Sequence, residues 1–87
     1  MPQIGATIEE MQSLQSKFTQ ESATVEQLKA SITGQLGATW WVGPARQRFE
    51  DAWNSQYQPM LTQLQTSLQE CSAEVQRTAD GLVAAGG

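Results

Sequence analysis

Apolar residues recur every seven positions along the first half of the chain. The repeat consists of Ile4, Met11, Phe18, Val25 and Ile32. Leu14 and Leu28 fall three residues after two of its members, and this spacing keeps one stripe of a helix apolar over about four heptads. Thr7 and Glu10 have the spacing of a capping box, in which each side chain bonds a free backbone donor at a helix start. We therefore predict a helix over about residues 7–37.

A second apolar pattern follows Gly43 and Pro44. Its members lie mostly three or four residues apart, and they are Phe49, Trp53, Tyr57, Met60, Leu61, Leu64, Leu68, Cys71, Val75, Thr78 and Leu82. Proline suits the first position of a helix because its φ is fixed and it needs no backbone donor there. The pattern predicts a second helix over about residues 44–81, with Gly43 as its cap.

Two residues interrupt the second pattern. Pro59 lacks a backbone donor, so we expect a bend near Gln58, because the apolar pattern continues beyond it. Gly81 can adopt the left-handed conformation that often ends a helix. We expect the helix to stop there and residues 82–87 to form a flexible tail.

These elements predict a single all-α domain over residues 1–87, an antiparallel helical hairpin with a turn at about residues 38–43. Ile8 and Leu36 widen the apolar stripe of the first helix to roughly 160°, more than one neighbouring helix covers. We therefore expect two hairpins to pair into a four-helix bundle. The residues predicted for the core and dimer interface are Met11, Phe18, Val25, Ile32, Leu61, Leu64, Leu68 and Val75.

Composition narrows the possible functions. The net charge is −4 with five basic residues, which argues against nucleic acid as a partner. No apolar run approaches the roughly 20 residues that span a bilayer, and residues 1–6 lack the features of a signal peptide, so we expect no stable membrane insertion. One cysteine and no histidine argue against a zinc site, and no base accompanies a nucleophile. We expect neither an enzyme, nor a metal, nor a cofactor.

Large rings gather around the predicted turn. Trp40 and Trp41 precede Gly43, and Phe49 and Trp53 follow within the next two helical turns. We expect Trp41 and Phe49 to close the open end of the core. Adjacent turn residues do not easily both point inward, so we expect either Trp40 or Trp41 to be exposed as a contact for another protein.

Trp41-Val42-Gly43 at the centre of the chain, with Ala45 and Phe49 after it and a heptad helix on each side, resembles the WXG family of about 100 residues. These are the early-secreted-antigen (ESAT-like) proteins of type VII secretion, and the resemblance covers the whole chain. It implies a helical-hairpin dimer, either a homodimer or a heterodimer with a paralogue. It also implies export of the folded protein from the cytoplasm by a membrane-embedded secretion ATPase, so that the protein is secreted, extracellular or on the cell surface, without a cleaved signal peptide.

The chain departs from the family in one motif. The family's export signal is a tyrosine followed four residues later by an acidic residue near the end of the second helix. Gln76 and Asp80 occupy these positions here, so the spacing remains and the aromatic residue is lost. The resemblance then favours a heterodimer whose partner supplies an intact signal, and a homodimer stays open. The alternative function is an intracellular helical-bundle adaptor or assembly subunit, against which the turn motif argues.

Overall fold

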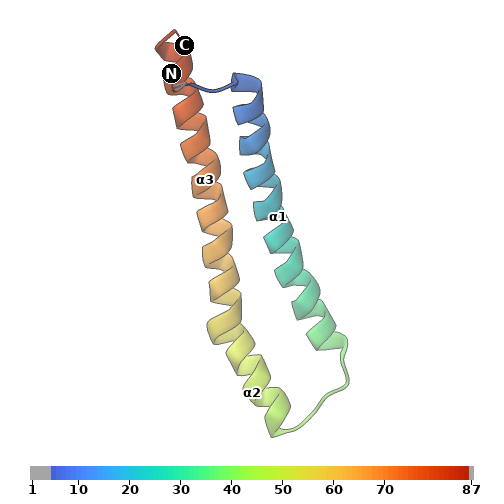
Figure 1. Cartoon of the computed structure of the whole chain (residues 1–87). Coiled ribbons are helices and arrows are strands. Elements are labelled where there is room, and N and C mark those ends of the chain that lie inside the picture. Colours follow the sequence, from blue (N-terminus) through green and yellow to red (C-terminus); the bar gives the residue numbers. More distant parts are fainter. Residues whose placement is uncertain (1–4, 87) are drawn as a thin grey trace.

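The computed structural model describes residues 5–86, and every regular element in that range is helical. Helix α1 spans Ile8–Ala38, α2 spans Pro44–Ala52, a π-helical segment η1 spans Trp53–Tyr57, and α3 spans Gln58–Ala84. Because α2, η1 and α3 follow one another without a gap, they form one rod that runs antiparallel to α1 (Figure 1). The molecule measures 64 × 22 × 18 Å. This confirms the predicted all-α helical hairpin.

The start of α1 differs from the prediction in one detail. Thr7 occupies the cap position with an extended backbone (φ −79°, ψ 118°), but its side chain makes no capping hydrogen bond. The predicted capping box is therefore wrong. The Thr7 carbonyl instead accepts the Met11 amide at 3.0 Å, the ordinary first bond of a helix.

The bend expected near Gln58 falls next to a π-helical segment. The Gln58 amide donates to the Trp53 carbonyl five residues earlier, immediately before Pro59, which has no donor. This geometry inserts one extra residue into the helix and turns everything before it by about 100°. Without that rotation, Trp53 would lie on the same stripe as Met60. With it, Trp53 faces α1 and is only 5% exposed.

Polar side chains make many of the contacts between the two helices. The buried apolar side chains among residues 5–86 are Val25, Trp53 and Ala79, and the buried polar ones are Ser22 and Ser72. The cross-helix hydrogen bonds include Trp53 Nε1 to Thr33 Oγ1 (3.1 Å), Thr19 and Ser72 hydroxyls (2.9 Å), Ser22 Oγ to the Gln65 carbonyl (3.3 Å), and Ser72 Oγ to the Gln15 carbonyl (3.2 Å). The hairpin therefore has a small apolar core of its own.

Helix α3 continues past Gly81. It ends at Ala84, and the left-handed backbone occurs at Gly86 (φ 75°). The expected stop at Gly81 is wrong, so residues 82–84 of the predicted tail are helical. A glycine inside a helix costs only about 1 kcal/mol, and continuing the helix keeps the next residue, Leu82, half-buried.

Candidate functional site

The large apolar side chains exposed along the two rods include Tyr57, Met60 and Val83 and four others that we consider together. These four are Leu14 (47% exposed), Leu28 (42%) and Ile32 (39%) on α1, and Leu64 (47%) on α3. We call these four residues the apolar face. Large apolar groups that share one side of a small protein are typical of a surface that binds another protein.

The helical geometry brings these residues to one side of the molecule. Ser22 faces α3, where its hydroxyl bonds the Gln65 carbonyl. At about 100° per residue, the three exposed side chains of α1 lie roughly 80° to 120° to one side of Ser22, and Leu64 lies about 100° to the same rotational side of Gln65. Because the helices are antiparallel, rotations in the same sense bring both groups to the same face. The cross-helix bond of Ser22 lies in the seam between the helices, and Thr19, about 60° to the other rotational side of Ser22, bonds Ser72 toward the opposite face, which we call the polar side.

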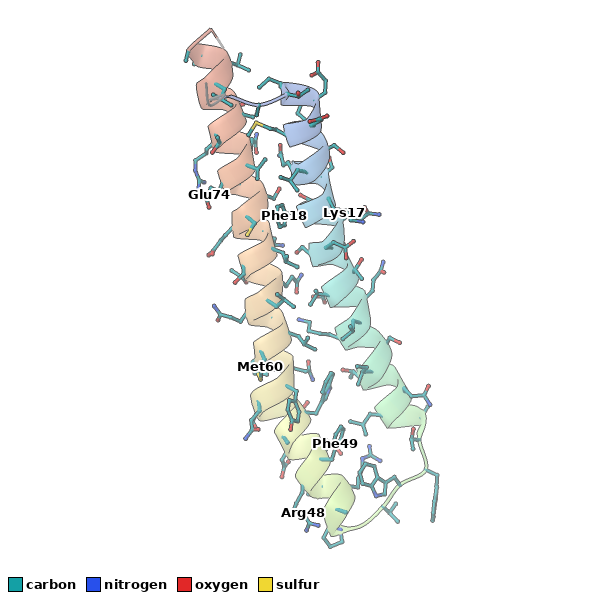
Figure 2. All side chains as sticks on the ribbon, in the orientation of Figure 1. Lys17, Phe18, Arg48, Phe49, Met60 and Glu74 are labelled. Atoms are coloured by element: carbon teal, nitrogen blue, oxygen red, sulfur yellow. The ribbon has the colours of Figure 1, made fainter. Side chains whose placement is uncertain are left out.

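The residues predicted for the core and interface divide between the hairpin interior and the apolar face. Val25 is buried, and Ile32 and Leu64 are exposed. The half-buried members are Met11, Phe18, Leu61, Leu68 and Val75. Figure 2 shows Phe18 between the two rods, with Met60 at the outer side of α3. The predicted set omits Leu14 and Leu28, although their place on the apolar stripe of the first helix was a usable signal.

Charged side chains of α1 are paired within the chain, and one of them, Glu21, lies between Leu14 and Leu28 on the side of the apolar face. Lys17 and Glu21 form an ion pair of 3.2 Å along α1. Lys29 reaches Glu26 at 3.3 Å and the hydroxyl of Thr62 on α3 at 2.9 Å, with only 14% of its side chain exposed. Its aliphatic stem is thus covered while its charge has two partners.

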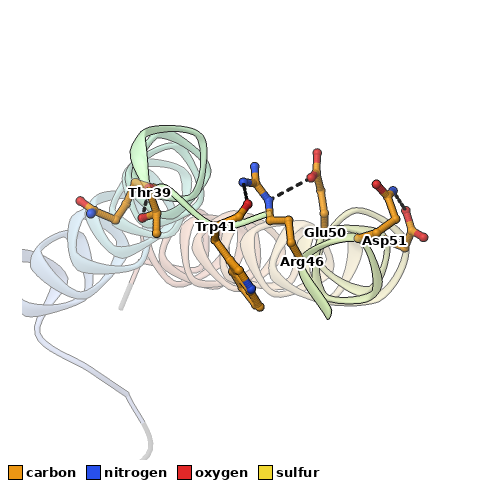
Figure 3. Close-up of polar contacts among 7 residues, drawn as sticks. Thr39, Trp41, Arg46, Glu50 and Asp51 are labelled. Carbon is orange, nitrogen blue, oxygen red and sulfur yellow. Dashed lines mark hydrogen bonds and ion pairs between the residues drawn. The ribbon is translucent and has the colours of Figure 1, made fainter. Parts of the chain in front are cut away.

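A second candidate region is the turn between α1 and α2, whose backbone depends on Gly43. Its φ of 113° lies in a region that side chains rarely adopt, and Pro44 follows as the first residue of α2, as predicted. Arg46, in the first turn of α2, reaches back to the turn. Its Nη1 donates to the Trp41 carbonyl at 2.9 Å, and its Nε donates to Glu50 Oε2 at 3.2 Å (Figure 3).

The aromatic residues of the turn do not close the core as expected. The rings of Trp41 and Phe49 have centroids 5.9 Å apart, yet the residues remain 36% and 40% exposed. Trp40 is 87% exposed and Val42 is 71% exposed. The reason is that α1 packs along α3 while α2 diverges from α1 toward the turn (Figure 1).

Trp53 does not belong to the exposed aromatic end that the sequence suggested. Its indole lies in the hairpin core and donates to Thr33, because the π-helical segment turns it toward α1. We therefore define the tip as Trp40, Trp41, Val42 and Phe49. The sequence signal that was available was Pro59, whose missing donor six residues later favours an irregular turn of helix.

The residues in place of the family's export signal lie on α3. Gln76 accepts a hydrogen bond from Gln15 Nε2 at 3.2 Å, so it contacts α1 across the polar side of the hairpin. Asp80 is exposed four residues later. The spacing of four keeps both on neighbouring turns of one helix surface.

Among residues 5–86, no group of three or more His, Cys, Asp or Glu side chains could hold a metal ion. No helix in the same range is long and apolar enough to cross a membrane. An open groove of about 460 Å³ lies on the polar side, and its lining consists of Thr19, Ser22, Ala23, Glu26, Gln27, Gln65 and Gln69.

Replacing Gly43 with alanine should destabilise the hairpin by about 1–2 kcal/mol, because the left-handed backbone strains any residue with a Cβ. Space is not the cause, since a Cβ built at Gly43 meets no atom within 4 Å. Gly34 is the matched control: it lies inside α1 with equally open space, and Gly34→Ala should stabilise by about 0.5–1 kcal/mol. Thermal unfolding followed by circular dichroism measures both. Equal effects of the same sign would contradict the backbone argument.

The comparison with known families agrees with this geometry. The model of the family described as proteins of 100 residues with WXG matches residues 3–86. Searches among curated proteins and solved structures gave no significant match. The family match takes in both rods of the hairpin and the turn with Trp41-Val42-Gly43. The chain therefore belongs to the family of proteins of 100 residues with WXG.

Proposed function

We propose that this protein is an export substrate of a type VII secretion system and leaves the cell as a folded dimer of helical hairpins. Membership of the WXG family supports the secretion route. The observation that best supports a dimer is the apolar face, where four large side chains remain 39–47% exposed in the single hairpin. A second hairpin on this face completes a four-helix bundle.

The accessible area supports the same arrangement. The chain exposes 6493 Å², whereas a compact protein of its mass of 9.5 kDa exposes about 5000 Å². The difference, about 1500 Å², exceeds the roughly 800 Å² that each partner buries in a protein interface of standard size. The elongated hairpin therefore has enough extra surface for an interface of standard size.

The partner is a paralogue of the same family or a second copy of this chain. Gln76 and Asp80 keep the spacing of the export signal without its tyrosine. Under the proposal, a paralogous partner with the intact signal supplies the aromatic group to the secretion ATPase, and this chain travels with it. The protein thus acts by binding other proteins, first its partner and then the export machinery.

Deletion of the secretion ATPase should abolish the appearance of this protein outside the cell. The measurement compares culture filtrate and cell lysate from the parent strain and the deletion strain, with a cytoplasmic enzyme as the control for lysis. We expect the protein in the filtrate of the parent alone, and its accumulation in the cells of the deletion strain. Retention inside the cells of both strains would refute export and favour the intracellular adaptor.

A further inference from the structure

We propose that Arg46 is a positioning residue, which holds the turn so that the tip is presented to the export machinery in one fixed conformation. The inference rests on the proposed function and adds the residue that prepares the tip for recognition. Its basis is the geometry between the first turn of α2 and the Trp41 carbonyl.

The turn has few internal restraints. Its flanks are fixed by the Thr39 amide, which donates to the Leu36 carbonyl at 3.4 Å, and by the Gln47 amide, which donates to the Gly43 carbonyl at 3.2 Å. Between these bonds, residues 40–42 take part in no backbone–backbone hydrogen bond of the kind seen on either side. Their restraints are the ring contact between Trp41 and Phe49 and the bond from Arg46 to the Trp41 carbonyl.

Arg46 is itself held in position. Glu50, one helical turn further on, accepts from Nε at 3.2 Å and leaves Nη1 directed at the Trp41 carbonyl at 2.9 Å (Figure 3). Only 22% of the Arg46 side chain is exposed, whereas Glu50 is 40% exposed. A planar guanidinium makes both bonds at once, which an ammonium group on a flexible stem does not.

The position of this contact favours a role in recognition over a role in stability. The ion pair between Arg46 and Glu50 is partly exposed, and exposed ion pairs contribute little to the stability of a fold. By contrast, a loop that is fixed before binding loses less conformational freedom when its partner arrives, so its affinity is higher. The Trp41 carbonyl that Arg46 holds belongs to the same turn as Trp40 and Val42, which are 87% and 71% exposed. Exposed tryptophan side chains are typical of the residues that dominate protein interfaces.

The test replaces Arg46 with alanine in the full-length protein, expressed in the bacterium that carries the secretion system. We expect the exported fraction to fall about 5- to 20-fold, with the melting temperature and the dimer mass unchanged. Amide hydrogen exchange at residues 40–42 should become faster. Arg46→Lys keeps the charge beside Glu50 and should restore only part of the export.

Gln47→Ala is the matched control. Gln47 Nε2 donates to Asp51 Oδ1 at 3.1 Å with the same spacing on the same helix, so this bond stays within α2. Export of this variant should equal that of the wild type. Undiminished export of Arg46→Ala would overturn the inference, and so would a loss of dimer mass that matches the loss of export. A wild-type protein that stays in the cell would instead overturn the proposed function, and this inference with it.

Discussion

Replacing Trp53 with alanine is expected to lower the free energy of unfolding by about 3–5 kcal/mol, because it removes a large ring from a small core and leaves a cavity. The core of the hairpin has few members to compensate, since Val25 and Ala79 are the other buried apolar side chains among residues 5–86. Small proteins have about 5–15 kcal/mol in total, so the variant should be largely unfolded at modest denaturant concentrations. Urea unfolding followed by circular dichroism measures the change.

Two control variants separate the causes of this loss. Trp40→Ala removes the same kind of ring from a position that is 87% exposed, so the free energy of unfolding should change by less than about 0.5 kcal/mol. Thr33→Val removes the acceptor of the Trp53 indole and should cost about 1 kcal/mol. If Trp40→Ala were as destabilising as Trp53→Ala, the assignment of Trp53 to the core would be wrong.

Replacing Leu64 with lysine should weaken dimerisation at least about 100-fold, because a charge would be buried at the centre of the bundle without a partner. Leu64 is 47% exposed in the single hairpin, so the substitution leaves the hairpin's own packing largely intact. Sedimentation equilibrium with the wild-type partner measures the dissociation constant.

The neighbouring residue offers a matched control for this variant. Gln63→Lys adds the same charge one position earlier on α3, at an exposed site turned about 100° away from Leu64. Its dimerisation should equal that of the wild type. Equal weakening by both substitutions would indicate a general effect of net charge and would remove the apolar face from the interface.

Local patterns in the sequence were sufficient to predict the hairpin and the position of its turn. The seven-residue repeat predicted a first helix that the structure places at Ile8–Ala38, and Gly43-Pro44 predicted the start of the second rod. Both signals are local: helical periodicity shows in the spacing of apolar residues, and proline fixes φ at the first position. The two residues that widen the apolar stripe of the first helix, Ile8 and Leu36, are half-buried, and the stripe residues that stay exposed are Leu14, Leu28 and Ile32.

The positions of the tryptophans depended on features that the repeat does not encode. A regular helix through Pro59 places Trp53 near the exposed stripe, and only the extra residue of the π-helical segment turns it into the core. The exposure of Trp41 follows from the divergence of α2 from α1, which is a property of tertiary packing. The bond from Arg46 to the Trp41 carbonyl spans a turn whose backbone the sequence specifies only at Gly43.

The central claim is that a single hairpin does not cover its own apolar face and folds together with a second one. Sedimentation velocity at micromolar concentrations, on the chain alone and co-expressed with the products of adjacent genes, tests it most directly. We expect the folded protein to sediment with about twice the 9.5 kDa mass of the chain, as a homodimer or with a paralogue of similar size. A stable folded monomer of 9.5 kDa under these conditions would contradict the claim.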